Sequence, residues 1–105
     1  MVSDVRMTVP VARVLAVFLD DPAADRYGTQ LMEASGLASG SLYPILTRLR
    51  KAGWAEARWE DIDPVAAGRP ARRYYRLTPE GASRASAALD ALHRQTRFPG
   101  VNPAW

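Results

Sequence analysis

Residues 36–49 decide the fold of this chain, and they read Gly36-Leu37-Ala38-Ser39-Gly40-Ser41-Leu42-Tyr43-Pro44-Ile45-Leu46-Thr47-Arg48-Leu49. Gly36 is a helix terminator, and Ser39, three residues later, can begin a new helix. In that new helix the apolar residues recur at helical spacing, at Leu42, Ile45, Leu46, Leu49 and Ala52. The pattern predicts two helices joined by a tight turn, the second of which Gly53 closes.

The sequence does not decide which of two serines caps the second of these helices. If Ser41 is the cap, Pro44 lies in the first turn, where its missing N–H costs little. If Ser39 is the cap, Pro44 should kink the helix or tighten its first turn. In both cases the face opposite the apolar stripe carries polar and basic residues, namely Ser41, Tyr43, Pro44, Thr47, Arg48 and Lys51.

Two more helices are predicted before this stretch. From Thr8 onward the apolar positions predict an amphipathic helix with Pro10 in its first turn, ending at Asp20-Asp21-Pro22. Its apolar positions are Val11, Val14, Leu15, Phe18 and Leu19. Asp25 can cap the next helix, on which Tyr27, Leu31 and Ala34 face one way.

A hairpin is predicted after the stretch. Residues 54–60 alternate as a strand does, and residues 72–77 are the return strand. Residues 61–71 contain two prolines and a glycine without apolar periodicity, which predicts a long mobile tip. Trp54 and Trp59 are expected to pack under the hairpin rather than to line a ligand pocket.

The last predicted element is a helix that begins at Thr78-Pro79-Glu80, with a capping hydroxyl, a proline and an acid in order. It should run to about Arg97, with a heptad-like apolar stripe at Ala82, Ala85, Leu89 and Leu92. We expect a binding domain at 8–78, a C-terminal dimerisation helix at 79–97 and an irregular tail at 98–105. The fold class is mainly α with a small β-hairpin.

Charge gathers in two short segments. The chain has a net charge of +3, and thirteen of its fourteen basic residues are arginine. Residues 38–53 carry +3 and residues 69–76 carry +4, whereas residues 54–68 sum to −3. Two compact basic segments are typical of a polyanion-binding footprint, and arginine suits phosphate and guanine. A GC-rich genome would also explain the arginine content.

Helix, turn, basic helix, strand, loop, basic strand and helix is the order of a winged helix-turn-helix, which usually binds DNA. Several motifs resemble the PadR family of bacterial transcriptional regulators, over roughly residues 11–90. The matching motifs are Tyr27-Gly28 with Leu31, Gly40-Ser41-Leu42-Tyr43-Pro44, Gly68-Arg69-Pro70, Tyr75 and Leu77-Thr78-Pro79-Glu80-Gly81. The resemblance implies a homodimeric repressor of the short subgroup, which has a single C-terminal helix that packs against the partner.

Candidate site residues follow from both arguments. The DNA-binding set is Tyr27, Ser39, Gly40, Ser41, Tyr43, Pro44, Thr47, Arg48, Lys51, Arg69 and Arg72. Arg73 and Arg76 could instead pair across the hairpin with Glu56, Glu60 or Asp61. The uncovered apolar stripe predicts a dimer interface of Val11, Leu15, Phe18, Ala82, Ala85, Leu89 and Leu92. The resemblance makes a small aromatic effector at the dimer axis plausible.

Other classes of function have little support. There is no cysteine, and the carboxylates Glu60, Asp61 and Asp63 have no histidine nearby, so we expect neither a metal nor another cofactor. His93 stands alone, so no catalytic triad and no enzyme is expected. Neither a signal peptide nor a membrane helix is apparent, which fits a cytoplasmic protein that binds double-stranded DNA. A winged-helix module that binds protein and no DNA remains the alternative.

Overall fold

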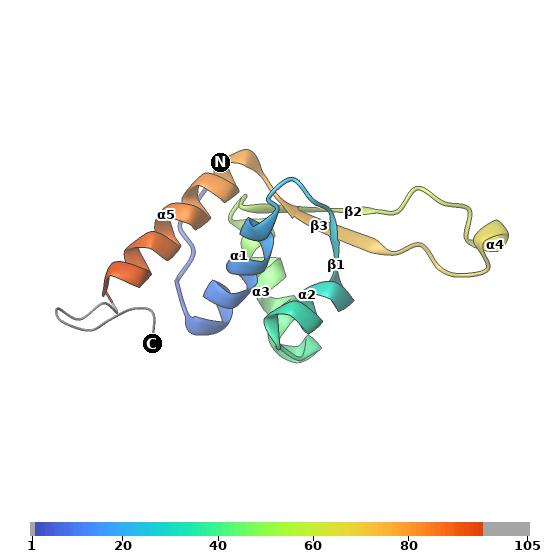
Figure 1. The fold of residues 1–105 in the computed structure, drawn as a ribbon. Coiled ribbons are helices and arrows are strands. Elements are labelled where there is room, and N and C mark those ends of the chain that lie inside the picture. Colours follow the sequence, from blue (N-terminus) through green and yellow to red (C-terminus); the bar gives the residue numbers. More distant parts are fainter. Residues whose placement is uncertain (1, 96–105) are drawn as a thin grey trace.

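The structure, a computed structural model, describes residues 2–95 of the chain (Figure 1). Its elements, in order, are α1 (Val9–Asp20), β1 (Arg26–Tyr27), α2 (Gly28–Ser35), α3 (Ser39–Lys51), β2 (Ala55–Trp59), α4 (Pro64–Ala67), β3 (Arg73–Leu77) and α5 (Pro79–Gln95). The predicted class, mainly helical with a small β-hairpin, is therefore confirmed. The predicted tail at 98–105, and the last helix beyond Gln95, lie outside the described residues.

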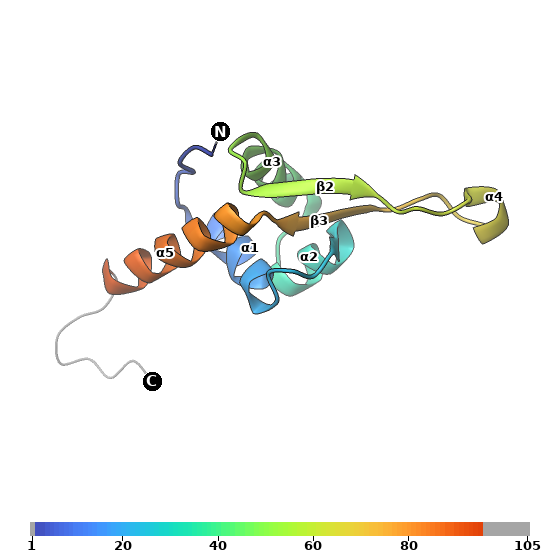
Figure 2. The ribbon, with the colours of Figure 1, turned by 90° about the horizontal axis from the view of Figure 1, so that it is seen from above.

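The sheet is antiparallel, with the strand order β1-β3-β2. Helices α1, α2 and α3 lie on one side of it, and the outer half of the β2–β3 hairpin projects as a wing that ends in α4 (Figure 1). Seen from above, α5 leaves the base of the hairpin in the direction opposite to the wing (Figure 2). Helices α2 and α3 thus lie between α5 and the tip of the wing.

One apolar core joins the helices to the base of the hairpin. On α3 the predicted stripe is buried, since Leu42, Ile45, Leu46 and Leu49 are 0–4% exposed. The α1 stripe is equally buried, and this corrects the sequence prediction of a dimer interface. Val11, Leu15 and Phe18 are at most 1% exposed and Ala85 is fully buried, so a partner chain cannot reach them.

The start of α2 differs from the prediction, which placed a cap at Asp25. The helix begins at Gly28, and the N–H of its cap residue Tyr27 donates to Oε1 of Gln30 at 2.9 Å. Arg26 and Tyr27 instead form the short strand β1, opposite Tyr75 and Tyr74 of β3. Asp25 accepts from Arg58 of β2, at 3.0 Å and 3.2 Å, instead of capping the helix. A two-residue strand has too little pattern to be recognised without its partner.

Neither serine caps α3. The cap residue is Ala38, which makes no side-chain capping bond, and Pro44 lies inside the helix. Because proline has no N–H, the carbonyl of Gly40 lacks its usual helical donor. Gly40 lies in the exposed first turn of α3.

The wing tip and Trp59 also differ from the predictions. The tip contains a one-turn helix, α4, whose cap Asp63 accepts from the N–H of Val65 at 3.0 Å. Trp54 is buried as predicted, but Trp59 is 65% exposed rather than packed under the hairpin. The alternation of a strand does not reveal where the hairpin leaves the body of the protein.

Two close contacts fix the join between β3 and α5. As predicted, Thr78 starts the helix: its Oγ1 accepts from the N–H of Gly81 at 2.9 Å and donates to the carbonyl of Gly53 at 2.8 Å. A Cβ at Gly81 would overlap the backbone of Trp54. Only glycine therefore lets the first turn of α5 approach the start of β2 so closely.

Candidate nucleic-acid interface

The outward face of α3 is open along its whole length. All of its predicted contact residues are exposed, namely Ser39, Gly40, Ser41, Tyr43, Pro44, Thr47, Arg48 and Lys51. No carboxylate among residues 2–95 forms an ion pair with the three basic residues at its C-terminal end, Arg48, Arg50 and Lys51. This face therefore keeps the full positive charge that its sequence carries.

Tyr43 connects α3 to α2. Its ring is only partly covered, with 42% of the residue exposed. A Cβ at Gly28 would overlap the Tyr43 hydroxyl and approach its ring carbons at 3.1 and 3.3 Å. The missing side chain at Gly28 thus provides the space in which Tyr43 lies, and the two residues fix how α2 meets the first turn of α3.

A cluster of hydrogen-bonding side chains ties the wing to β1. The hydroxyls of Tyr27 and Tyr74 lie 2.6 Å apart, and the oxygen of each is 3.2 Å from Oε2 of Glu60, so two phenol protons are shared among three contacts. Their rings are stacked, with centroids 4.4 Å apart. Nη1 and Nη2 of Arg69 donate to the two oxygens of Glu60 at 2.6 Å and 3.1 Å, a bidentate pair.

This cluster shifts the pKa values of Glu60 and Tyr74, and the hydrogen bond with Glu60 also raises the pKa of Arg69. The hydrogen bond from Arg69 lowers the pKa of the Glu60 carboxyl to about 2, and the backbone N–H of Arg72 and the Tyr27 hydroxyl act in the same direction. The hydrogen bond with Tyr27 raises the pKa of Tyr74 to about 12, with burial and the charge of Glu60 adding to it. At neutral pH Glu60 is therefore a carboxylate, Arg69 is a guanidinium and Tyr74 is a neutral phenol.

Two of the four arginines of residues 69–76 form ion pairs with carboxylates. Arg69, predicted to contact DNA, is bound to Glu60. Arg76 donates from Nε to Oε1 of Glu56 at 2.7 Å, as the sequence allowed. The positive charge that the wing strand shows in the sequence is therefore partly neutralised by the strand beside it.

The other two arginines lie over aromatic rings. The guanidinium of Arg72 is 5.1 Å from the ring centroid of Tyr27, and that of Arg73 is 5.6 Å from Trp59 and 5.9 Å from Tyr75. Neither is in an ion pair within the described residues, and Nε of Arg73 is buried without a hydrogen-bond partner there. Cation–π contacts hold a guanidinium in place but leave its charge uncompensated.

A pocket brings the helices and the wing together. It has a volume of about 530 Å³ and lies between the start of α2, α3 and β3. Its lining residues are Tyr27, Gly28, Thr29, Tyr43, Arg72, Arg73 and Tyr75. The pocket thus brings Tyr43, from the exposed face of α3, together with the two wing arginines.

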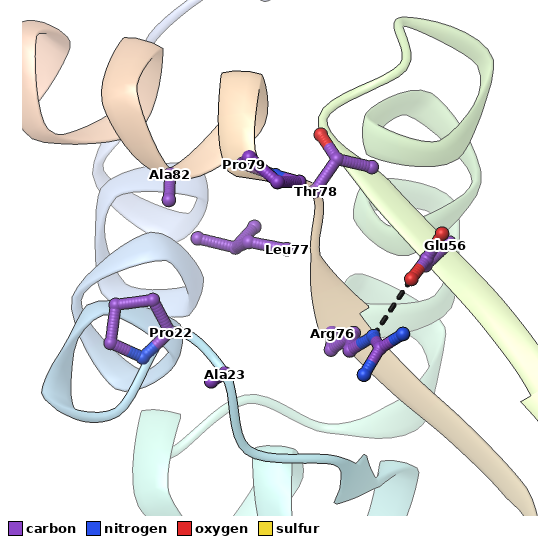
Figure 3. Close-up of a pocket in the computed structure, with 8 residues that line it drawn as sticks. All are labelled: Pro22, Ala23, Glu56, Arg76, Leu77, Thr78, Pro79 and Ala82. Atoms are coloured by element: carbon purple, nitrogen blue, oxygen red, sulfur yellow. Dashed lines mark hydrogen bonds and ion pairs between the residues drawn. The ribbon is translucent and has the colours of Figure 1, made fainter.

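Two other hollows lie away from this surface. One, of about 370 Å³, lies between the loop after α1, the end of β3 and the start of α5, with the Glu56–Arg76 pair at its edge (Figure 3). The other is an open, largely apolar groove of about 550 Å³ along α1 and α5. It is lined by Val9, Ala12, Arg13, Ala16, Leu89, Asp90, Leu92 and His93.

The sequence predicted that Trp59 packs under the hairpin and allowed an ion pair for Arg73; Trp59 is instead exposed, and Arg73 has no ion pair within the described residues. The alternation of β2 and β3 would have placed the two residues opposite each other, as the register Trp59↔Arg73 shows. It could not show that both lie beyond the core. Of the wing carboxylates, Glu60 pairs with Arg69 and Asp63 caps α4, and no group of His, Cys, Asp or Glu within residues 2–95 is arranged to hold a metal ion. In the same part of the chain, no helix is long and apolar enough to cross a membrane.

A family model described as the transcriptional regulator PadR-like family matches residues 18–87. No protein of curated function matches the chain. Among solved structures, a PadR-like transcription factor from Bacteroides fragilis has a TM-score of 0.65 at 20% identity, covering 81% of either chain. A candidate DNA-binding protein from Ralstonia eutropha has a TM-score of 0.61 at 25% identity, over 79% of this chain and 98% of its own.

A third similar structure is BpsR of Bordetella bronchiseptica, whose DNA binding is regulated by 6-hydroxynicotinic acid. It has a TM-score of 0.69 at 18% identity, over 98% of this chain and 74% of its own. At this identity the likeness concerns the fold, which has the helix, turn, helix and wing arrangement described above.

Proposed function

Because the chain belongs to the PadR-like family of transcriptional regulators, we propose that it is a cytoplasmic, homodimeric repressor that binds an inverted-repeat operator. Family membership makes it a regulator of transcription and not an enzyme. One observation carries the proposal of DNA binding. Tyr43, on the exposed face of α3, lines the same pocket as Arg72 and Arg73, the two wing arginines without a carboxylate partner in the described residues.

In the proposed complex, α3 lies in the major groove and the wing lies along the adjoining backbone. Tyr43, Thr47 and Arg48 face the base edges or the phosphates, and Lys51 adds charge at the end of the helix. Tyr27 contributes by stacking under Arg72, as their 5.1 Å separation indicates. We do not assign Arg69 to DNA, since both of its terminal nitrogens already donate to Glu60.

The test is a gel-shift with the DNA upstream of the protein's own coding region. We expect Arg48→Ala to weaken binding by about 1–3 kcal/mol if Arg48 reads a guanine bidentately. The matched control is Arg84→Ala, which removes the same charge from α5, where Arg84 pairs with Asp4 at 3.2 Å. Equal binding by wild type and Arg48→Ala would contradict the proposed docking of α3.

The dimer is proposed through the apolar groove along α1 and α5. Val9 is 65% exposed on α1, and Leu89 and Leu92 are half-buried on α5. Apolar side chains in an open groove favour coverage by a second copy. Ala82 lies nearer the start of α5 and is also half-buried. Two copies related by a two-fold axis would place half-sites about one helical turn apart, or a multiple of it.

Light scattering tests this interface. We expect wild type to be a dimer and Val9→Glu, which lies outside the core, to be a folded monomer whose thermal midpoint no longer depends on protein concentration. Leu89→Glu should also be monomeric and lose operator binding. A monomeric wild type at micromolar concentration would remove the dimer from the proposal, while a dimer that Val9→Glu leaves intact would move the interface elsewhere.

A small planar aromatic effector is the second part of the proposal. Its support is the regulated DNA binding of BpsR and the apolar groove, which would be enclosed if a second copy covered it. An effector acts only if it binds the free and the DNA-bound forms with different affinity. Aromatic acids titrated into the protein–DNA complex should release DNA; tight binding without release would make the ligand incidental.

The alternative of a winged-helix module that binds only proteins is tested by the same gel-shift. A folded dimer that shifts no upstream DNA, even at low salt, would favour it. The basic surface favours DNA, because arginines without a carboxylate partner attract the phosphates of a duplex.

A further inference from the structure

The wing has a stem and a tip that differ in charge. We define the stem as residues 57–60 and 69–75, and the tip as residues 61–68. The tip carries Asp61 and Asp63 and no basic residue, and its most exposed apolar side chain is Val65, at 90%. A tip with this charge would be repelled by phosphates, so its approach to DNA is unfavourable.

One face of the stem carries an aromatic and a basic side chain instead of acidic ones. Trp59 and Arg73 are opposite each other in the register, and Ala57 and Tyr75 are the next pair on the same face. Tyr75 is 6% exposed because this face packs on the helices at the base of the hairpin. Two residues farther out, the same face is no longer covered, and Trp59 is 65% exposed. Trp59 and Arg73 therefore project from the side of the wing that faces α3.

The position of Arg73 supports this direction. It shares the 530 Å³ pocket with Tyr43 of α3, so a duplex on the exposed face of α3 would meet Arg73 next. Its guanidinium lies between the rings of Trp59 and Tyr75, at 5.6 Å and 5.9 Å from their centroids. Its Nε is buried without a hydrogen-bond partner in the described part of the chain. The two rings therefore hold the Arg73 guanidinium in place, and it has no carboxylate partner in the described part of the chain.

We propose that Trp59 and Arg73 together contact the DNA backbone, and that the wing binds DNA through these two residues of its stem and not through its tip. Arg73 pairs with a phosphate, and the exposed indole of Trp59 packs on the neighbouring deoxyribose while holding the guanidinium in place. The inference rests on the proposed DNA-binding function, which it deepens. It assigns DNA contact to a tryptophan that the sequence pattern places in the core.

Fluorescence gives the direct test. A Trp105→Phe protein keeps Trp54, which is 3% exposed, and Trp59. Its emission should fall when it binds the upstream DNA fragment. A Trp59→Phe/Trp105→Phe protein keeps only the buried Trp54, and its emission should not change. An unchanged signal for both proteins on a fragment that both bind would overturn the inference.

Affinity gives the second test, on the same fragment. Trp59→Ala should weaken binding about fivefold, and Trp59→Phe should recover most of the loss because a ring remains. Arg73→Ala should weaken binding about tenfold and lower the slope of log affinity against log salt by about one. The matched control is Arg76→Ala, three residues along the same strand but paired with Glu56 on the other face, which should bind as wild type does.

The tip supplies the opposite control. Val65→Ser and Asp61→Asn should each change affinity by less than about twofold. Tighter binding by Asp61→Asn, with Trp59→Ala unchanged, would show that the tip and not the stem lies on DNA and would overturn the inference. If wild type binds no DNA at all, the proposed function fails and this inference fails with it; wild-type binding that Trp59→Ala retains removes the inference alone.

Discussion

The two ends of the β2–β3 hairpin are held by different kinds of interaction. At the base, backbone groups and buried side chains fill the space: Trp54 is 3% exposed, and the N–H of Thr78 donates to its carbonyl at 2.9 Å. In the wing, side chains make the contacts, through the Glu60–Arg69 pair and aromatic rings beneath guanidinium groups. The base thus depends on close packing, whereas the wing depends on how its charges are distributed, and the two should respond differently to substitution.

The largest expected effect is at the base, with Gly81→Ala. The added Cβ would overlap the backbone of Trp54, which cannot move without shifting β2 or α5. We expect a loss of about 3 kcal/mol in the free energy of unfolding, measured by urea denaturation. The control is Gly40→Ala, where a Cβ meets open space and helix propensity should raise stability slightly. Equal stability of both variants would show that the base is less tightly packed than described.

Thr78→Val should have the next largest effect. Valine keeps the shape of the side chain but loses both the bond from the Gly81 N–H and the bond to the Gly53 carbonyl. A loss of about 1 kcal/mol is expected in the same assay. Thr78→Ser keeps the hydroxyl and should lose little. If Thr78→Ser and Thr78→Val lower the free energy of unfolding equally, the methyl group of Thr78 and not its capping hydroxyl stabilises this join.

In the wing, Glu60→Gln should have a smaller effect that depends on pH. The pKa of Glu60 is lowered from its ordinary value of 4.5 to about 2 in the folded chain. Its stabilising contribution is therefore complete above pH 4.5 and is lost as the pH falls toward 2. Unfolding free energies of wild type and Glu60→Gln should differ at pH 7 and converge over that range.

The matched variant for this comparison is Glu56→Gln. Glu56 also pairs with an arginine, but its side chain is 49% exposed, against 10% for Glu60. Its variant should be closer to wild type at pH 7. Parallel curves for wild type and Glu60→Gln down to pH 2 would contradict the assigned role of Glu60.

The smallest effect should come from Arg58→Gln. Arg58 pairs with Asp25 at 3.0 Å, but its side chain is 53% exposed. An exposed pair of this kind contributes little, so we expect a change below about 0.5 kcal/mol in the urea assay. A loss as large as that of Thr78→Val would mean that the wing, like the base, depends on single contacts.

The sequence predicted those elements whose pattern is local. The α3 stripe, the glycine at the end of α2 and the start of α5 at Thr78 depend on spacings of three to seven residues, and the structure has all three. The predicted start of α2 was wrong because the residues before it form β1, a strand that exists only through its pairing with β3. Long-range pairing leaves almost no signal in a two-residue segment.

The predicted site was limited by the same cause. An amphipathic stripe shows that Phe18 is buried, but not whether its own chain or a partner buries it. A count of arginines shows charge, but not that Glu60 neutralises Arg69 and leaves Arg73 without an acid. The exposed face of α3 was predicted correctly as a surface, because burial there follows from the helical period alone. Its contacts with DNA remain a prediction.

The join at Thr78 has a mechanical consequence. β3 ends at Leu77 and α5 begins at Pro79, so one residue, bonded on both sides, connects them. Such a joint transmits rotation instead of absorbing it. The 17 residues of α5 extend about 25 Å from this point, and the wing extends the opposite way (Figure 2). Because Gly81 also lies against the backbone of Trp54, we expect a tilt of α5 to shift the base of the hairpin and, with it, the wing.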